Sequence, residues 1–284
     1  YPNGKRGRPV KGIERMLRMY LLQIWFHLSD EGTEDELSDS ISMRKFMRLE
    51  EWEKAPDATT LLKFRRLLEK HELNRAIFES LNRVLEETGH TLRGGSVVDA
   101  TIIQAPSSTK NQEKKRDEEM RSTKKNNQFY FGMKAHIGVD AFSGLVHTVK
   151  VTSANVADVT VAAELLRDDD RFMYGDNGYQ GIARRAEIAG SETLSKIDFR
   201  VNCRRRSLPN VSEKAIDWNR HIEFLKSSVR CKVEFPFRIV KGIFGFCKTA
   251  YRGLKKNENR LYMLFACSNL YALASAGRTL SPAW

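Results

Sequence analysis

One carboxylate stands in the middle of an apolar, β-branched run that predicts a buried strand. The run is Ser96–Ile103, with the sequence SVVDATII, and the carboxylate is Asp99. Val and Ile favour a pleated, buried surface, whereas Asp is depleted from strands. A buried carboxylate is costly unless a metal ion or a hydrogen-bond network compensates its charge. Asp99 is therefore the first candidate for a functional residue.

Two later carboxylates are candidates to share a metal site with Asp99. Asp176 ends a short predicted strand at 171–176 and precedes a glycine-bounded loop, and Glu234 lies in a predicted helix. Mg²⁺ prefers a few hard oxygen ligands and leaves its other positions to water and substrate phosphate. A pair of such ions supports phosphoryl transfer on nucleic acid. The three carboxylates thus predict a metal site for Mg²⁺ or Mn²⁺, although any single acid among the 36 in the chain is more often solvated or a helix cap.

Basic residues flank the third carboxylate and recur elsewhere in the chain. Arg230 lies four residues before Glu234 and shares its helix face, and Lys241 follows close to that face. Both are predicted to contact phosphate oxygens, with an exposed basic helix face as the alternative. The other residues predicted to bind DNA are Lys124, Lys125, Lys134, Arg204, Arg205 and Arg206.

The overall charge favours a polyanionic partner. The 284 residues carry a formal net charge of +12, with a sequence pI near 9.6. Such a balance suggests nucleic acid first and an anionic membrane second, or simply a soluble basic protein. No stretch approaches the roughly 18 consecutive apolar residues of a membrane span, and the start has no secretory apolar core. The four cysteines lack a C-x-x-C pair, which favours a reducing compartment over a disulfide framework or a zinc site.

The predicted elements fall into a helical region followed by a mixed region. Residues 12–88 show amphipathic helical periodicity, so they form a DNA-binding or dimerising module or helices that only pack. Strands are then predicted at 96–103, 129–140, 145–151, 171–176 and 193–202, with a polar loop at 105–128. Helices are predicted at 159–166, at 217–246 with a kink or break at Pro236, and at 259–276. This order predicts an α/β fold with a mixed sheet behind an all-helical segment.

Several strings of the chain closely resemble bacterial insertion-sequence transposases of the Asp-Asp-Glu (DDE) class, in particular the insertion sequence 5 group. In the mixed region these strings are VVDATII, KNNQFYFGMKAHIGVD, YGDNGYQG and SVRCKVEFPFRIVKGIFGF. In the helical region they are GRPVKGIERMLRMYLLQIWFHLSD and PDATTLLKFRRLLEKH. The resemblance therefore spans nearly the whole chain. Members of this group usually carry a segment before the GRP string that is mostly missing here, so we expect the chain either to be a fragment or to have its start upstream of Tyr1.

The resemblance implies a fold, a site and partners. It implies an RNase H-like catalytic domain over residues 91–284, with a mixed β-sheet flanked by helices, preceded by a helical DNA-binding or dimerisation region over residues 1–90. It assigns the catalytic and metal-binding triad to Asp99, Asp176 and Glu234, with two Mg²⁺ ions or Mn²⁺ as cofactor. The implied partner is double-stranded DNA, as terminal inverted repeats and target, bound by a homodimer on paired ends. The implied location is the bacterial cytoplasm at the nucleoid.

The resemblance also implies a reaction. The wider insertion-sequence signature places a Tyr, an Arg, the catalytic Glu and a Lys at set spacing; Arg230, Glu234 and Lys241 match it, and Ser227 stands at the Tyr position. In the implied mechanism, activated water cuts the element's end, and the resulting 3′-hydroxyl attacks a target phosphodiester. Two alternatives remain: an RNase H-like nuclease that does not join strands, and a truncated, non-catalytic DNA-binding remnant.

Overall fold

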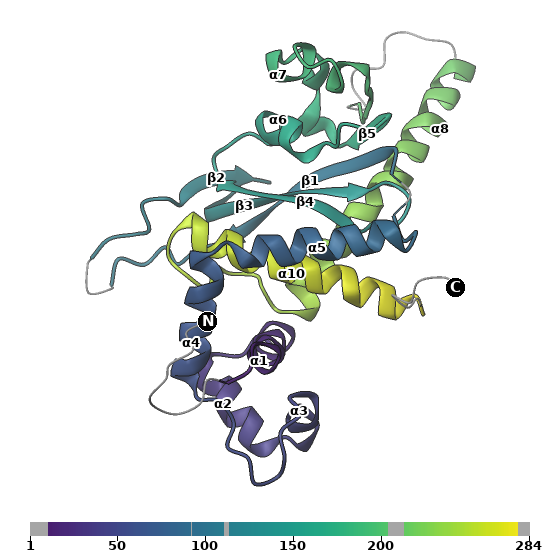
Figure 1. The fold of residues 1–284 in the computed structure, drawn as a ribbon. Coiled ribbons are helices and arrows are strands. Elements are labelled where there is room, and N and C mark those ends of the chain that lie inside the picture. The colour runs from purple at the N-terminus through teal and green to yellow at the C-terminus, as the bar shows by residue number, and fades with distance from the viewer. Residues whose placement is uncertain (1–10, 92, 111–113, 204–212, 278–284) are drawn as a thin grey trace.

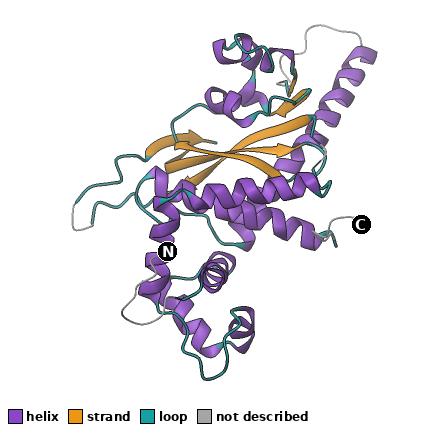
Figure 2. Ribbon diagram, viewed as in Figure 1, coloured by secondary structure: helices purple, strands orange, loops and turns teal. Residues whose placement is uncertain are grey.

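The computed structural model describes residues 11–91, 93–110, 114–203 and 213–277 of the chain. Five helices come first (Figures 1 and 2): α1 (Ile13–Trp25), α2 (Asp30–Asp39), α3 (Ile41–Phe46), α4 (Ala58–Lys70) and α5 (Leu73–Glu87). The strands are β1 (Gly95–Gln104), β2 (Arg121–Lys125), β3 (Gln128–Asp140), β4 (Val146–Ser153), β5 (Phe172–Gly175) and β6 (Asp198–Val201). The later helices are α6 (Asp158–Val161), α7 (Ala186–Ala189), α8 (Glu213–Arg230), α9 (Glu234–Arg238) and α10 (Leu254–Ser275).

The strands form one mixed sheet. Its order is β2-β3-β1-β5-β6, and β4 also pairs with β3. Strand β3 is antiparallel to β1, β2 and β4, whereas β5 is parallel to both β1 and β6. The predicted α/β fold, a mixed sheet flanked by helices and preceded by an all-helical segment, is confirmed. No helix in the described part of the chain is long and apolar enough to cross a membrane.

Helices cover both faces of the sheet, which explains the unbroken apolar run in β1. Figure 1 shows α5 and α10 side by side on one face and α6 and α7 on the other. Val97 packs in the hydrophobic cluster that contains α10, and Val98 packs in a separate cluster with Ile182. Successive side chains of a strand point to opposite faces, so both faces of β1 require apolar residues.

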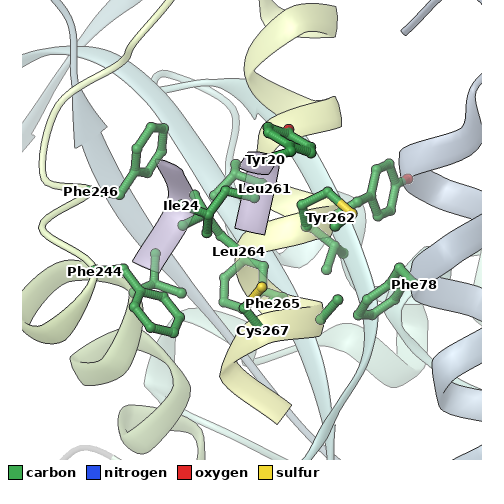
Figure 3. Packing of buried hydrophobic residues seen from close by; sticks show 14 of the residues in the cluster. Tyr20, Ile24, Phe78, Phe244, Phe246, Leu261, Tyr262, Leu264, Phe265 and Cys267 are labelled. Carbon is green, nitrogen blue, oxygen red and sulfur yellow. The ribbon is translucent and has the colours of Figure 1, made fainter. Parts of the chain in front are cut away.

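The helical region and the sheet share one hydrophobic core. Figure 3 shows Tyr20 and Ile24 of α1 beside Leu261 of α10, with Phe78 of α5 next to Tyr262. The same cluster continues into the sheet through Val97. Burial of this continuous apolar surface fixes the N-terminal helices to the strand that carries Asp99. The division near residue 90 stays a prediction.

Three predicted elements differ from the structure. Residues 105–128 were expected to be a long polar loop, but they contain β2. The side chains of β2 are polar, so the sequence gives no sign that this segment pairs with β3. The strand expected at 193–202 is confined to β6, because a 3₁₀ turn occupies Leu194–Lys196. The long helix expected over 217–246 ends at Arg230, and a tight turn at Cys231–Val233 precedes α9. Pro236 does not break α9 because it lies in the first turn, where proline is tolerated.

Candidate active site

Asp99 lies in the middle of β1 with a side chain only 21% exposed. Its Oδ1 accepts a hydrogen bond from the backbone N–H of Ala100 at 2.7 Å, and its Oδ2 lies 3.7 Å from Nη1 of Arg230. Burial raises the pKa of Asp99 to about 6, and the nearby charge of Asp176 acts in the same direction. The Ala100 hydrogen bond and the Arg230 charge oppose that rise. The positive charge and hydrogen bonding around Asp99 are therefore too weak to compensate for the burial of its carboxylate.

Asp176 is brought beside Asp99 by the parallel pairing of β1 and β5. Val97 pairs with Tyr174, and each carboxylate follows two residues after its member of that pair. Because β1 and β5 are adjacent and parallel, Asp99 and Asp176 lie at the same height along the two strands. Asp176 Oδ1 accepts a hydrogen bond from the backbone N–H of Gly178 at 2.8 Å, which orients the carboxylate at the start of a 3₁₀ turn.

Glu234 reaches the site through Arg230. It is the first residue of α9, its side chain is 59% exposed, and its Oε1 lies 3.2 Å from Nη2 of Arg230. The guanidinium of Arg230 therefore lies between Asp99 and Glu234; it donates a hydrogen bond to Glu234 and forms a longer ion pair with Asp99. In the described ranges, no three His, Cys, Asp or Glu side chains stand close enough to bind one ion. The structure brings Asp99 and Asp176 together, and an arginine stands between Asp99 and Glu234.

The chemistry around Asp99 fits a hydrated divalent cation. Tyr179 is fully buried, and its hydroxyl has no hydrogen-bond partner among the residues described. Burial raises the pKa of Tyr179 well above its usual value, and the charges of Asp99, Asp158 and Asp176 raise it further. Two neighbouring carboxylates and an unpartnered hydroxyl are what an ion with bound water would satisfy, because Mg²⁺ takes oxygen ligands and keeps several waters.

Sequence reasoning missed Asp158, which lies at the start of α6 and adds negative charge near Asp99. Lys134 on β3 neutralises it, with Nζ 2.9 Å from Asp158 Oδ1 and 2.7 Å from the carbonyl oxygen of Val156. His136 lies on the same face of β3, fully buried, with Nδ1 3.8 Å from Asp158 Oδ1. The sequence did contain a signal for this polar cluster. Lys134 and His136 lie two residues apart in a predicted strand, so both side chains point to the same face of the strand.

The other residues predicted to bind DNA lie in different settings. Lys124 and Lys125 are exposed at the end of β2. Lys241 lies in a wide turn at Ile239–Ile243, where its Nζ donates to the carbonyl oxygen of Ile102 at 2.7 Å, and burial lowers its pKa. Arg204, Arg205 and Arg206 lie outside the described residues.

Lys134 is committed to Asp158, so its loss should affect folding more than DNA binding. Replacing Lys134 by methionine leaves the partly buried Asp158 unpaired and should lower the free energy of unfolding by about 1–3 kcal/mol. Urea unfolding at neutral pH measures this change. The matched control is Lys150→Met, since Lys150 pairs with the more exposed Glu164 and should change stability by less than about 1 kcal/mol. Equal effects of the two substitutions would contradict the assignment.

Two family models match this chain. A model described as "Transposase DDE domain" matches residues 90–270, and one described as "Transposase domain (DUF772)" matches residues 1–67. No solved structure matches the chain. The first match spans β1 to α10 and includes all three carboxylates, and it implies an RNase H-like fold for the mixed sheet and a metal-dependent, DNA-binding enzyme. The chain therefore belongs to the insertion-sequence transposases of the DDE type.

Proposed function

We propose that this transposase cuts the ends of its insertion sequence and joins the resulting 3′-hydroxyl to target DNA, in a metal-dependent reaction. The observation that carries the proposal is the register of β1 and β5, which sets Asp99 beside Asp176 within a domain of the DDE family. Arg230 ties Glu234 to the same site.

Each residue of the site has a role in this proposal. Asp99, Asp176 and Glu234 would hold two Mg²⁺ ions, with Mn²⁺ as a substitute, and bound divalent ions there would activate the attacking hydroxyl and stabilise charge on the phosphate. Before the metal ions bind, Arg230 pairs with both Asp99 and Glu234 and fixes their relative positions. Once the ions release Arg230, its guanidinium suits a phosphate oxygen. Tyr179 supplies a buried hydroxyl beside the carboxylates.

The finer assignment follows the sequence resemblance. We propose that the protein is a member of the insertion sequence 5 group, and that it acts at the bacterial nucleoid as a homodimer on paired ends. Its DNA partners would be the terminal inverted repeats and the target duplex. The helical region at residues 1–90 would supply end recognition or dimer contacts, and residues 91–284 would supply the chemistry. The formal net charge of +12 falls entirely within residues 91–284 and supports a DNA partner for that region.

A strand-transfer assay tests the proposal. Labelled element-end DNA and a target plasmid are incubated with the protein and Mg²⁺ or Mn²⁺, and both cut ends and joined products are measured. We expect both products. Cutting without joining would identify a nuclease, and DNA binding without cutting would identify a non-catalytic remnant; either result overturns the proposed function.

Replacing Glu234 by glutamine should reduce cleavage by about 10²–10³-fold, because the site loses an anionic ligand for the ions that would stabilise charge on the reacting phosphate. The change should leave stability within about 1 kcal/mol, since the side chain is 59% exposed. The matched control is Glu79→Gln, which removes an exposed carboxylate with the same i,i+4 pairing to an arginine, Arg75. Cleavage by Glu234→Gln at the rate of Glu79→Gln would exclude Glu234 from the site.

A further inference from the structure

Strands β2 and β3 form an exposed hairpin at the end of the sheet opposite α8 (Figure 1). Lys125 pairs with Gln128, so the connecting turn is Asn126-Asn127. Both turn residues have positive φ, 48° and 62°, as a type I′ turn requires. Such a turn matches the twist of its strands and is the tightest common connection of a hairpin. The tip is therefore a defined two-stranded ribbon.

The hairpin exposes an aromatic ring that the core does not use. Phe129 is 75% exposed, whereas Phe131, two residues later on the same face, packs against the main hydrophobic cluster. Lys124 stands directly opposite Phe129, with Nζ 5.8 Å from the centre of the ring. Among described residues, neither Lys124 nor Lys125 forms an ion pair. An exposed phenylalanine bordered by unpaired cations matches a partner that offers both anionic groups and stacked rings.

Positive charge continues from the hairpin to the active site. Lys125 lies near enough to Lys241 to help lower its pKa, after the larger effect of burial. Lys241 in turn donates to the carbonyl oxygen of Ile102, three residues beyond Asp99 on β1. Lys125 and Lys241 therefore place positive charge between the hairpin tip and the strand that carries Asp99, on the side where a bound DNA backbone would need it.

We propose that the β2–β3 hairpin inserts into a groove of the DNA held at the active site, with Lys124 and Lys125 on phosphates and Phe129 wedged at a base step. The inference rests on the proposed function and deepens it by naming the surface that binds the DNA substrate. Two-stranded ribbons bind in the major or the minor groove of a duplex, and proteins that bind the minor groove insert phenylalanine between base steps.

The distance between Phe129 and the active site follows from the length of β3 that separates them. Ile137 of β3 lies opposite Asp99, and Phe129 lies eight residues before it on the same strand. At about 3.4 Å per residue, that separation is about 27 Å. On DNA that runs along β3, it corresponds to about eight base-pair steps of 3.4 Å. The hairpin therefore contacts the duplex about six to ten base pairs from the cut phosphate.

Permanganate footprinting of the full chain on element-end DNA tests this placement, since an unstacked thymine reacts faster than a stacked one. Substrates carry a thymine at each step out to about twelve base pairs on both sides of the cut. The footprint is taken in EDTA, so it reports contact whether or not the protein cuts. We expect one thymine in the predicted window to react at least threefold faster with wild-type protein than with Phe129→Ala.

Two further variants complete the experiment. Phe142→Ala removes an exposed ring, 48% accessible, at the other end of β3 and should give the wild-type footprint. The double variant Lys124→Ala/Lys125→Ala should lower the slope of log binding constant against log salt by about two. A footprint that is the same in wild type and Phe129→Ala overturns the inference, whatever the salt slope. Failure of the proposed function has a separate sign, the absence of cut and joined products with Mg²⁺ or Mn²⁺.

Discussion

Replacing Asp99 by asparagine should reduce DNA cleavage by at least about 10²–10³-fold and, in the absence of metal, should make the protein more stable. The activity falls because an amide removes the charge that the proposed cations need. The stability rises because Asp99 is a half-buried carboxylate whose pKa burial raises to about 6. The hydrogen bond from the Ala100 N–H and a weak ion pair with Arg230 Nη1, at 3.7 Å, offset that burial only in part.

The pH dependence follows from the direction of this pKa change. The folded protein binds the Asp99 proton more tightly than the unfolded chain, so ionisation of Asp99 destabilises the fold. Stability should therefore fall as pH rises from about 4 through 6, with a full effect on the order of 3 kcal/mol above pH 6. Urea unfolding in EDTA at pH 4.5 and pH 7.5, on wild type and Asp99→Asn, measures the difference. The variant should gain about 3 kcal/mol over wild type at the higher pH and only about 1 kcal/mol at the lower pH.

Asp217→Asn is the matched control, because its side chain is 74% exposed and its loss should change neither cleavage nor the pH profile. If the stabilities of Asp99→Asn and wild type show the same pH dependence in EDTA, ionisation of Asp99 does not destabilise the fold. If Asp99→Asn still cuts DNA at the rate of Asp217→Asn, it is not catalytic.

Replacing Arg167 by methionine should cost the protein about 3–5 kcal/mol of unfolding free energy. Nη2 of Arg167 lies 3.3 Å from Asp140 Oδ2 and 3.1 Å from Asp170 Oδ1, and both carboxylate side chains are fully buried. The same nitrogen donates to the carbonyl oxygen of Gly95 at 3.1 Å, at the start of β1. The substitution leaves two buried acids without their cation and loosens the strand that carries Asp99.

Urea unfolding at neutral pH measures this loss. Arg220→Met is the control, because Arg220 pairs with Asp217 while both side chains are more than 70% exposed, and such pairs contribute at most about 1 kcal/mol. An Arg167→Met variant as stable as Arg220→Met would show that the buried pairs do not hold the sheet.

Asp99 and Asp176 were accessible to sequence reasoning because each breaks a local pattern. An acid inside SVVDATII contradicts the burial of its neighbours, and Asp176 ends a short apolar strand before a glycine-bounded loop. Their proximity was not accessible without the resemblance, since it depends on the parallel register of Val97 with Tyr174. Register is set by the packing of the whole sheet and not by either strand alone.

The parts that sequence reasoning missed depend on tertiary contacts. The polar β2 forms only because β3 supplies its hydrogen-bond partners. The pairing of Lys134 with Asp158 joins residues 24 positions apart in the sequence, so the sequence alone did not indicate it; the prediction that Lys134 binds DNA stays a prediction. Periodicity also continues through Cys231–Val233, where the chain makes a tighter turn that sets Glu234 at the start of a new helix. The pairing of Arg230 with Glu234 follows from their i,i+4 spacing, whereas its contact with Asp99 depends on the packing of α8 against β1.

The most direct measurement for the central claim is anomalous diffraction from crystals of the Mn²⁺-loaded protein bound to pre-cut end DNA. The proposed function predicts manganese peaks in contact with the carboxylates of Asp99 and Asp176, with Glu234 released from Arg230 and turned toward the same ions. Manganese bound elsewhere, or Glu234 still paired with Arg230 while the ions are present, would contradict it.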